Sequence, residues 1–154
     1  MPLQPQQLCP YLIVKGAQQA IDFYVRAFGA SVDFSLIDPG DGRVGHAELR
    51  FGATRVFVAD EYPDFGAVGP ERLGGSPVKL HLDVDDADAF VAQAVREGAV
   101  ILRPVRTEFH GHRTGLVSDP FGYSWFAASR VQEISPEEMQ RRWAAMMVKP
   151  EQAS

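Results

Sequence analysis

The chain has 154 residues, of which 45% are hydrophobic and 23% charged, with a formal net charge of -5 and a pI near 5.3. This length can bury a core as one domain or as two small packed modules. The acidic balance, without a Lys- and Arg-rich stripe, argues against nucleic-acid binding. No segment approaches the roughly 18 to 20 apolar residues of a membrane span. A single cysteine, Cys9, cannot form an internal disulfide, which fits a reducing cytoplasm. Together these features predict a soluble cytoplasmic protein without membrane or nucleic-acid partners.

Residues 8–34 and 78–104 follow the same pattern. Each begins with an alternating apolar run, Tyr11–Val14 or Leu80–Val84, which predicts a strand. An alanine-rich stretch with apolar residues at helical spacing follows in both copies and ends at a Gly-Ala pair, where glycine can close a helix in the left-handed conformation. The chain therefore contains a repeated strand–helix unit.

Three further strands are predicted in each copy, separated by turn residues. They are Ser31–Ile37, His46–Phe51 and Thr54–Ala59 in the first copy, and Val100–Pro104, Thr114–Val117 and Tyr123–Ala128 in the second. The turn Asp119-Pro120-Phe121-Gly122 precedes the last strand.

This pattern divides the chain into a first module at 1–60, a Gly- and Pro-rich linker or lid loop at 61–77, a second module at 78–130, and a C-terminal helix and tail at 131–154. Ser135, Pro136 and Glu138 form a capping box that predicts the start of this helix. Its apolar stripe is expected to pack against its own domain or a second subunit. The stripe consists of Met139, Trp143, Met146 and Met147.

Three segments carry a family resemblance: AIDFYVRAFGA at 20–30, VDDADAF at 84–90 and DPFGYSW at 119–125. They resemble the vicinal-oxygen-chelate superfamily of glyoxalase I, extradiol dioxygenases, fosfomycin-modifying transferases and bleomycin-resistance proteins. The segment SPEEMQRR at 135–142 is similar to a bacterial glyoxalase-like subgroup. The resemblance implies an α+β fold of two βαβββ modules, with a curved, cup-shaped mixed sheet, helices outside and a C-terminal helix.

In the enzymes of this family a divalent metal in the cup polarises the substrate as a Lewis acid. The resemblance places the four ligand positions, usually His, Glu, His and Glu, at Cys9, Glu48, Lys79 and Phe126. Only Glu48 matches. A catalytic metal needs about three protein ligands, so the usual four-ligand site is expected to be lost.

A displaced metal site is the alternative. Residues two apart share a strand face, so Tyr11, His46, Arg50 and His81 are expected to line the same cup. His46, Glu48 and His81, with Cys9 nearby, would suit a transition metal if their distances allowed. Taken singly, each histidine also fits a hydrogen-bonded structural role, and Cys9 fits burial as a small apolar residue.

A second polar cluster lies at 106–115, where His110 and His112 flank Gly111. It is interpreted either as a solvated turn or as a loop at the rim of the cup, before a strand. Arg113 could pair with a carboxylate there.

Two functions follow. The first is a homodimeric, bleomycin-resistance-like protein that binds an organic or cationic small molecule, without a cofactor, in a cup with Tyr11, Phe51, Phe109 and Phe126 as aromatic walls. The second is a glyoxalase- or dioxygenase-like enzyme with a divalent metal on His46, Glu48 and His81. Whether the modules pair within one chain or exchange between two stays open. The predicted ligand-binding residues are Cys9, Tyr11, His46, Glu48, Arg50, Lys79, His81 and Phe126.

Overall fold

The computed structural model describes residues 2–148 and confirms the α+β fold with two βαβββ modules. The first sheet has the order β1-β4-β3-β2, and the second has the matching order β5-β8-β7-β6. In each sheet the first strand runs parallel to the last, and the other neighbours are antiparallel. The first module contains β1 (Tyr11–Val14), α1 (Ala17–Phe28), β2 (Ser31–Ile37), β3 (Val44–Phe51) and β4 (Thr54–Asp60). The second contains β5 (Lys79–Asp83), α3 (Ala87–Arg96), β6 (Val100–Thr107), β7 (His112–Ser118) and β8 (Ser124–Arg130).

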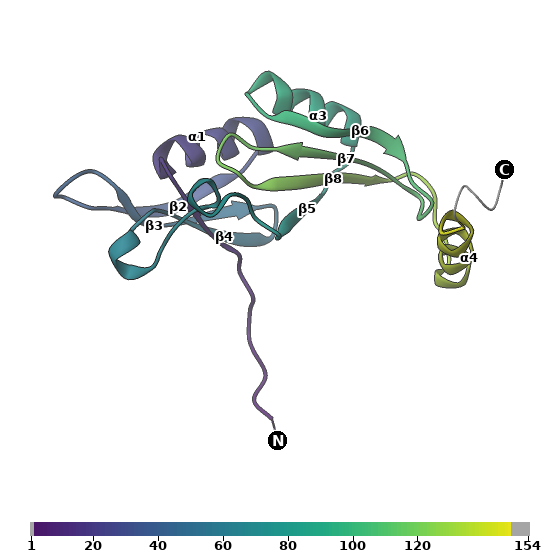
Figure 1. Ribbon diagram of the computed structural model, residues 1–154, viewed down its shortest axis with the longest axis horizontal. Helices are drawn as coiled ribbons and strands as arrows, with labels where there is room; N and C mark the ends of the chain where they lie inside the picture. The colour runs from purple at the N-terminus through teal and green to yellow at the C-terminus, as the bar shows by residue number, and fades with distance from the viewer. Residues whose placement is uncertain (1, 149–154) are drawn as a thin grey trace.

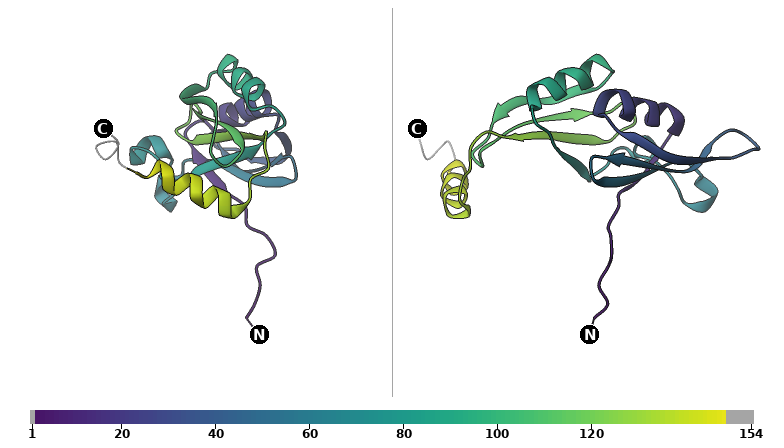
Figure 2. Two further views of the ribbon diagram at one scale, coloured as in Figure 1. Left: turned by 90° about the vertical axis from the view of Figure 1, so that its right-hand side faces the viewer. Right: turned by 180° about the vertical axis from the view of Figure 1, so that it is seen from behind.

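The two modules lie side by side, with α1 and α3 on the same side of the molecule (Figure 1). Each sheet therefore has one face covered by a helix and an opposite face that no helix of its module covers, which we call its open face. The views in Figure 2 place both open faces on one side of the molecule, where the N-terminal segment also projects. The fold therefore presents two uncovered sheet faces on the same side of the molecule (Figure 2).

The last strand of each module also fixes the start of its helix. The Asp60 carboxylate, on β4, accepts hydrogen bonds from the backbone N–H groups of Gly16 (3.0 Å) and Ala17 (2.8 Å). In the second module the Ser129 hydroxyl, on β8, accepts the N–H of Ala87 at 3.2 Å. These bonds satisfy N–H groups that a helix start leaves without partners, and they tie each helix to its sheet.

The core is continuous across the two modules. Phe28 of α1 stacks on Phe90 of α3, with ring centroids 5.6 Å apart. Phe51, at the end of β3, stacks on Trp125 of β8 at 5.3 Å. Phe51 therefore faces the helix side, and the expectation that it lines the open cup is wrong. Alternation along the strand explains this position, because Phe51 is an odd number of residues from Glu48.

Asp119, in the turn between β7 and β8, is a buried carboxylate with only 3% of its surface exposed. One oxygen accepts hydrogen bonds from the Tyr24 hydroxyl (2.7 Å) and the Trp125 indole N–H (2.9 Å). The other accepts the backbone N–H groups of Phe121 (2.8 Å) and Tyr123 (3.0 Å). Burial, followed by the Asp119 charge, raises the pKa of Tyr24 well above its usual value, so this hydroxyl remains a donor. The turn thus binds α1 of the first module to β8 of the second.

Several strands begin or end a few residues from their predicted bounds, and two of these differences bear on the second open face. β6 continues to Thr107 through Pro104, which an edge strand tolerates because its outer N–H groups need no partner; its pairing with β7 is irregular between Arg103 and Arg106. His112, predicted in a loop, is the first residue of β7 and pairs with Arg130.

Residues 61–77 carry a short 3₁₀ helix, η1 (Pro63–Phe65), and a single helical turn, α2 (Pro70–Leu73). Gly122, in the turn after Asp119, approaches this segment closely, since a Cβ added there would lie 2.7 Å from Pro70. A Cβ added at Gly69 would lie 2.8 Å from the Ile13 carbonyl oxygen of β1, so the segment is packed against both modules.

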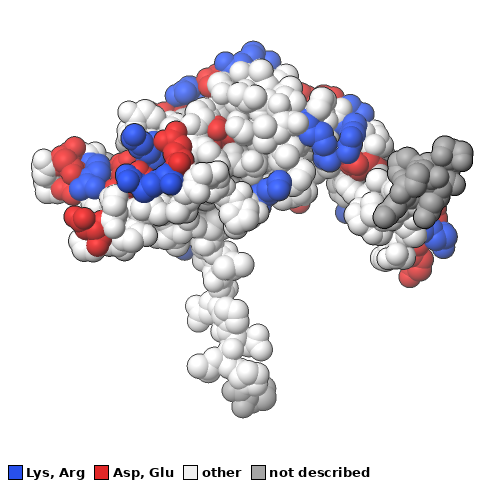
Figure 3. Space-filling view, in the orientation of Figure 1, with Lys and Arg blue, Asp and Glu red and all other residues white. Residues whose placement is uncertain are grey.

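The C-terminal helix α4 (Pro136–Met146) begins as predicted, because the Ser135 hydroxyl accepts the N–H of Glu138 at 3.2 Å. It lies at the far end of the second sheet (Figure 1). Residues 149–154 of the predicted tail lie outside the described residues. No helix within residues 2–148 is long and apolar enough to cross a bilayer. On the face shown in Figure 3, basic and acidic side chains occur in small mixed groups rather than in one basic stripe.

The buried carboxylate gives a test of the fold. In Asp119→Asn an amide N–H₂ replaces one of the two accepting oxygens, so the two donors bound to that oxygen lose their acceptor. Hydrogen bonds to buried charged groups contribute roughly 1.5 to 3 kcal/mol each, and we expect a loss of about 3 kcal/mol in the free energy of unfolding, measured by urea denaturation. Asp64→Asn, at an exposed position, is the matched control. Equal stability of the two variants would show that the Asp119 network does not hold the modules together.

Candidate functional site

The open face of the first sheet carries a row of polar and aromatic side chains. Tyr11 on β1 pairs with Phe57 on β4, which in turn pairs with Glu48 on β3. His46 lies two residues from Glu48, and its ring is 5.3 Å from Tyr11 and 5.1 Å from Phe57. Strand register therefore gathers side chains that are far apart in the sequence.

Hydrogen bonds connect these groups into a chain. The Tyr11 hydroxyl lies 2.7 Å from His46 Nδ1, and His46 Nε2 lies 3.0 Å from Glu48 Oε2. The other carboxylate oxygen, Oε1, forms a close ion pair with Arg55 Nη2. Both nitrogens of His46 and both oxygens of Glu48 already have partners, so neither side chain is free in this arrangement.

The protonation of Glu48 and Tyr11 indicates which groups can donate in these hydrogen bonds. The hydrogen bond from His46, with the Arg55 charge, lowers the pKa of Glu48, which stays ionised. Burial and then the Glu48 charge raise the pKa of Tyr11, which keeps its proton. A neutral His46 imidazole that donates through Nε2–H to Glu48 can accept the Tyr11 O–H at Nδ1, which corresponds to the Nε2–H tautomer.

The open face of the second sheet carries His81 on β5 and Phe126 on β8, directly paired in the sheet, with ring centroids 6.2 Å apart. The Arg103 guanidinium, from β6, lies 5.6 Å from the centroid of the Phe126 ring. Trp125, the preceding residue, points to the helix side and is 2% exposed. Successive strand residues point to opposite faces, and Phe126 accordingly stands on the open face.

A pocket of about 350 Å³ lies between this open face and α4, and we call it the α4 pocket. Arg106 Nε lies 2.6 Å and Arg103 Nη1 3.4 Å from Glu108 Oε1. Although burial opposes the shift, these two guanidiniums lower the pKa of Glu108. Burial, and then the neighbouring His112, lower the pKa of His110. The pocket is lined by His81, Arg103, Arg106, Glu108, Phe109, His110, Thr114, Phe126, Trp143 and Met146.

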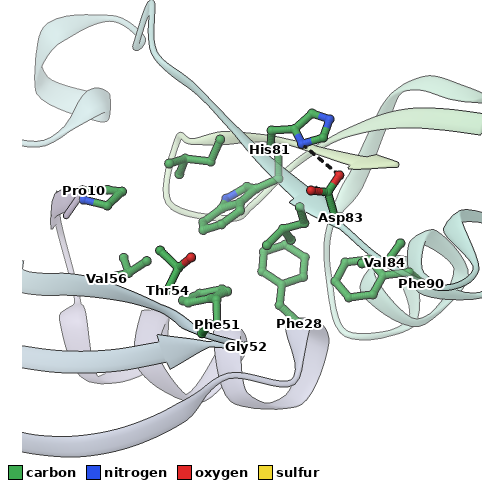
Figure 4. Close-up of a pocket in the computed structure, with 14 residues that line it drawn as sticks. Pro10, Phe28, Phe51, Gly52, Thr54, Val56, His81, Asp83, Val84 and Phe90 are labelled. Atoms are coloured by element: carbon green, nitrogen blue, oxygen red, sulfur yellow. Dashed lines mark ion pairs between the residues drawn. The ribbon is translucent and has the colours of Figure 1, made fainter. Parts of the chain in front are cut away.

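A second cavity, of about 360 Å³, lies at the seam between the modules. Figure 4 shows Phe28, Phe51 and Phe90 around it, with the His81–Asp83 pair at one side. His81 Nδ1 lies 3.7 Å from Asp83 Oδ1. Because the phenyl rings belong to the core that joins the modules, we assign this cavity to the packing of the modules.

The predicted ligand-binding residues are divided between the two open faces. Cys9, Tyr11, His46, Glu48 and Arg50 belong to the first module, and Lys79, His81 and Phe126 to the second. His46 and Glu48 touch, whereas His81 contacts neither of them. Across residues 2–148, no three His, Cys, Asp or Glu side chains are grouped closely enough to hold a metal ion.

The remaining predicted residues have separate surroundings. Cys9 is half-buried just before β1, Lys79 is the exposed first residue of β5, and Arg50 pairs with Asp33 on β2 at 3.0 Å. Arg113, expected to pair with a carboxylate, holds Asp88 of α3 at 2.8 Å.

Sequence reasoning missed Arg55, Phe57 and Arg103. For the first two a signal existed, because the Gly52-Ala53 hairpin sets Arg55 opposite Arg50 and Phe57 opposite Glu48. The irregular pairing of β6 places Arg103, and such a bulge has no clear sequence signature.

A protein-family model described as the Glyoxalase/Bleomycin resistance protein/Dioxygenase superfamily matches residues 6–126. An uncharacterized protein of Mycobacterium bovis is 38% identical over 136 residues, covering 86% of this chain and 89% of the relative. The X-ray structure of an Arabidopsis thaliana gene product superposes with a TM-score of 0.66 at 30% identity, covering 81% of this chain and 99% of that one.

A glyoxalase-related enzyme from Fulvimarina pelagi superposes with a TM-score of 0.64 at 21% identity, covering 82% of this chain and 89% of that one; this likeness concerns the fold alone. The repeated module, the strand order and the family match over residues 6–126 agree. The chain belongs to the Glyoxalase/Bleomycin resistance protein/Dioxygenase superfamily.

Proposed function

We propose that the protein binds a small organic molecule on the open faces of its sheets without using the metal of the family's enzymes. The observation that carries this proposal is the saturation of Glu48, whose two oxygens are engaged by His46 and Arg55. Glu48 is also the one residue that matches the family's ligand pattern.

The other ligand positions do not fit a divalent cation. Phe126 has no donor atom, and the ammonium group of Lys79 repels a cation. Cys9 could supply one thiol only. A catalytic metal needs about three protein ligands and an open position, and this set does not supply them.

We also propose a homodimer in which the open faces of two copies meet. All seven residues of β2 are exposed, among them Val32, Phe34, Leu36 and Ile37. β1 and β5 are paired on one side only, so a second copy can lie along these edges. Such an arrangement brings the first sheet of one copy toward the second sheet of the other.

A metal-dependent enzyme is the second candidate, and one observation favours it. His46 already contacts Glu48, and His81 stands with 54% of its side chain exposed on the other open face. A dimer that joined the two faces would supply a third ligand, provided that Arg55 released Glu48.

Metal content separates the two functions. We expect protein that has been incubated with Zn²⁺, Mn²⁺ or Ni²⁺ and then dialysed to hold far less than one ion per chain, because Glu48 is already neutralised. Elemental analysis of the wild type, His46→Ala and His81→Ala should give the same low content. One ion per chain that either substitution removes would support the enzyme instead.

Ligand binding is tested by thermal unfolding with a panel of aromatic and aliphatic metabolites and cationic glycopeptides. A ligand at a hundred times its Kd stabilises the folded state by about 2.7 kcal/mol, which raises Tm by several degrees. A flat response over the whole panel would contradict the binding function.

The dimer is tested by light scattering coupled to gel filtration. Phe34→Asp should shift the mass toward one chain, because it places a charge on the apolar β2 surface. Phe65→Asp is the control, since Phe65 is 85% exposed in η1, away from the sheet faces. A wild-type protein with the mass of one chain would rule the dimer out.

A further inference from the structure

We propose that the α4 pocket binds a carboxylate attached to an aromatic or other apolar group, with the negative charge opposite Arg103. This inference rests on the proposed small-molecule function and adds the chemical class of the ligand. The net charge of -5 favours a cationic ligand, but the local charges in this pocket have the opposite sign.

The charges in the pocket do not cancel. Its lining includes two guanidiniums, those of Arg103 and Arg106, and one carboxylate, that of Glu108. Glu108 is engaged by both guanidiniums and is 10% exposed. Arg142 donates to the carbonyl of Phe109 at 3.0 Å and is paired with Glu138 at 3.5 Å. One positive charge therefore remains uncompensated beside the cavity.

Arg103 is held in place before any ligand arrives. One of its terminal nitrogens donates to the Thr114 hydroxyl at 2.7 Å, and its guanidinium lies near the Phe126 ring. Its side chain is 30% exposed. A guanidinium with a fixed orientation attracts a carboxylate through a charge-assisted hydrogen bond, and little conformational freedom would be lost on binding.

The remaining walls are apolar. Phe126 forms the floor on the sheet, and Trp143 of α4 packs against Phe109 with ring centroids 5.7 Å apart, beside Met146. A volume of about 350 Å³ lies within the range of small-molecule sites, about 300 to 1,000 Å³. Aromatic walls beside two guanidiniums that share one carboxylate suit a ligand with an apolar body and an anionic end.

The experiment compares ligands that share a ring and differ in charge. Isothermal titration uses indole-3-acetate, indole-3-acetamide and tryptamine, and then phenylacetate, phenylacetamide and phenethylamine. In each set we expect the carboxylate to bind about ten- to hundredfold more tightly than the neutral amide, as a charge-assisted pair requires. The amine should be the weakest ligand, because it faces a guanidinium.

Substitutions test whether the preference for the carboxylate over the amide arises from the arginines of the α4 pocket. Arg103→Gln should reduce the advantage of the carboxylate over the amide by about tenfold or more while leaving the affinity for the amide similar. Arg96→Gln removes the same charge from the exposed end of α3 and should leave the ratio unchanged. Arg106→Gln, at a side chain 59% exposed, should give a smaller loss and provides a second reading if Arg103→Gln unfolds.

The outcomes distinguish this inference from the function on which it rests. Equal affinities within each set, or an amine that binds best, would overturn the carboxylate assignment and leave small-molecule binding intact. A carboxylate preference that survives both arginine substitutions would place the anion outside the α4 pocket. If no member of either set binds while the broader metabolite panel does, the ligand class is wrong; if both fail, the binding function fails as well.

Discussion

The arrangement of this protein depends on one buried carboxylate. Asp119 accepts four hydrogen bonds, which come from the helix of one module and from the turn and last strand of the other. A buried charge is costly unless all its acceptor positions are used, so the carboxylate favours only packings that keep these donors in place. The Tyr123 hydroxyl, from the same turn, donates to the Ile13 carbonyl of β1 at 3.0 Å. The modules are therefore joined through their helix side, and both open faces are left free.

The two open faces have the same strand order but differ in how their charges are balanced. On the first, Tyr11, His46, Glu48 and Arg55 form a closed chain in which donors and acceptors match. On the second, Glu108 neutralises only part of the charge of Arg103 and Arg106. A network in which every donor has an acceptor orients its side chains and leaves no group for a ligand. The positive charge that Glu108 does not neutralise lies beside aromatic rings and can attract an anionic ligand. The two modules thus share a backbone arrangement, and their open faces carry different side-chain chemistry.

The turn that contains Asp119 leads into β8 and also joins the two modules. Alternation along β8 turns Trp125 into the core and Phe126 onto the open face, because successive strand residues point in opposite directions. An aromatic wall consequently occupies the position where the family's pattern has a carboxylate. The same turn, through Asp119 and Tyr123, connects the second module to the first, and a linear pattern of turn residues contains no indication of partners about a hundred residues away.

Local patterns along the chain were sufficient to predict much of the fold. Alternation and helical spacing predict β1, α1 and β2 with little error, and the Ser135 cap predicts the start of α4, because these signals depend on neighbours only a few residues apart. The family resemblance likewise identifies the open-face positions of Glu48 and Phe126. Only the tertiary structure decided which of these positions meet. Register across the β3–β4 hairpin brings Arg55 onto Glu48, a bulge in β6 brings Arg103 over Phe126, and the helix-side packing of the modules separates His81 from His46. These contacts depend on strand register and long-range packing, and a shift of one residue in register would move each side chain to the other face of its sheet. For that reason the sequence alone determined the modules but not the site.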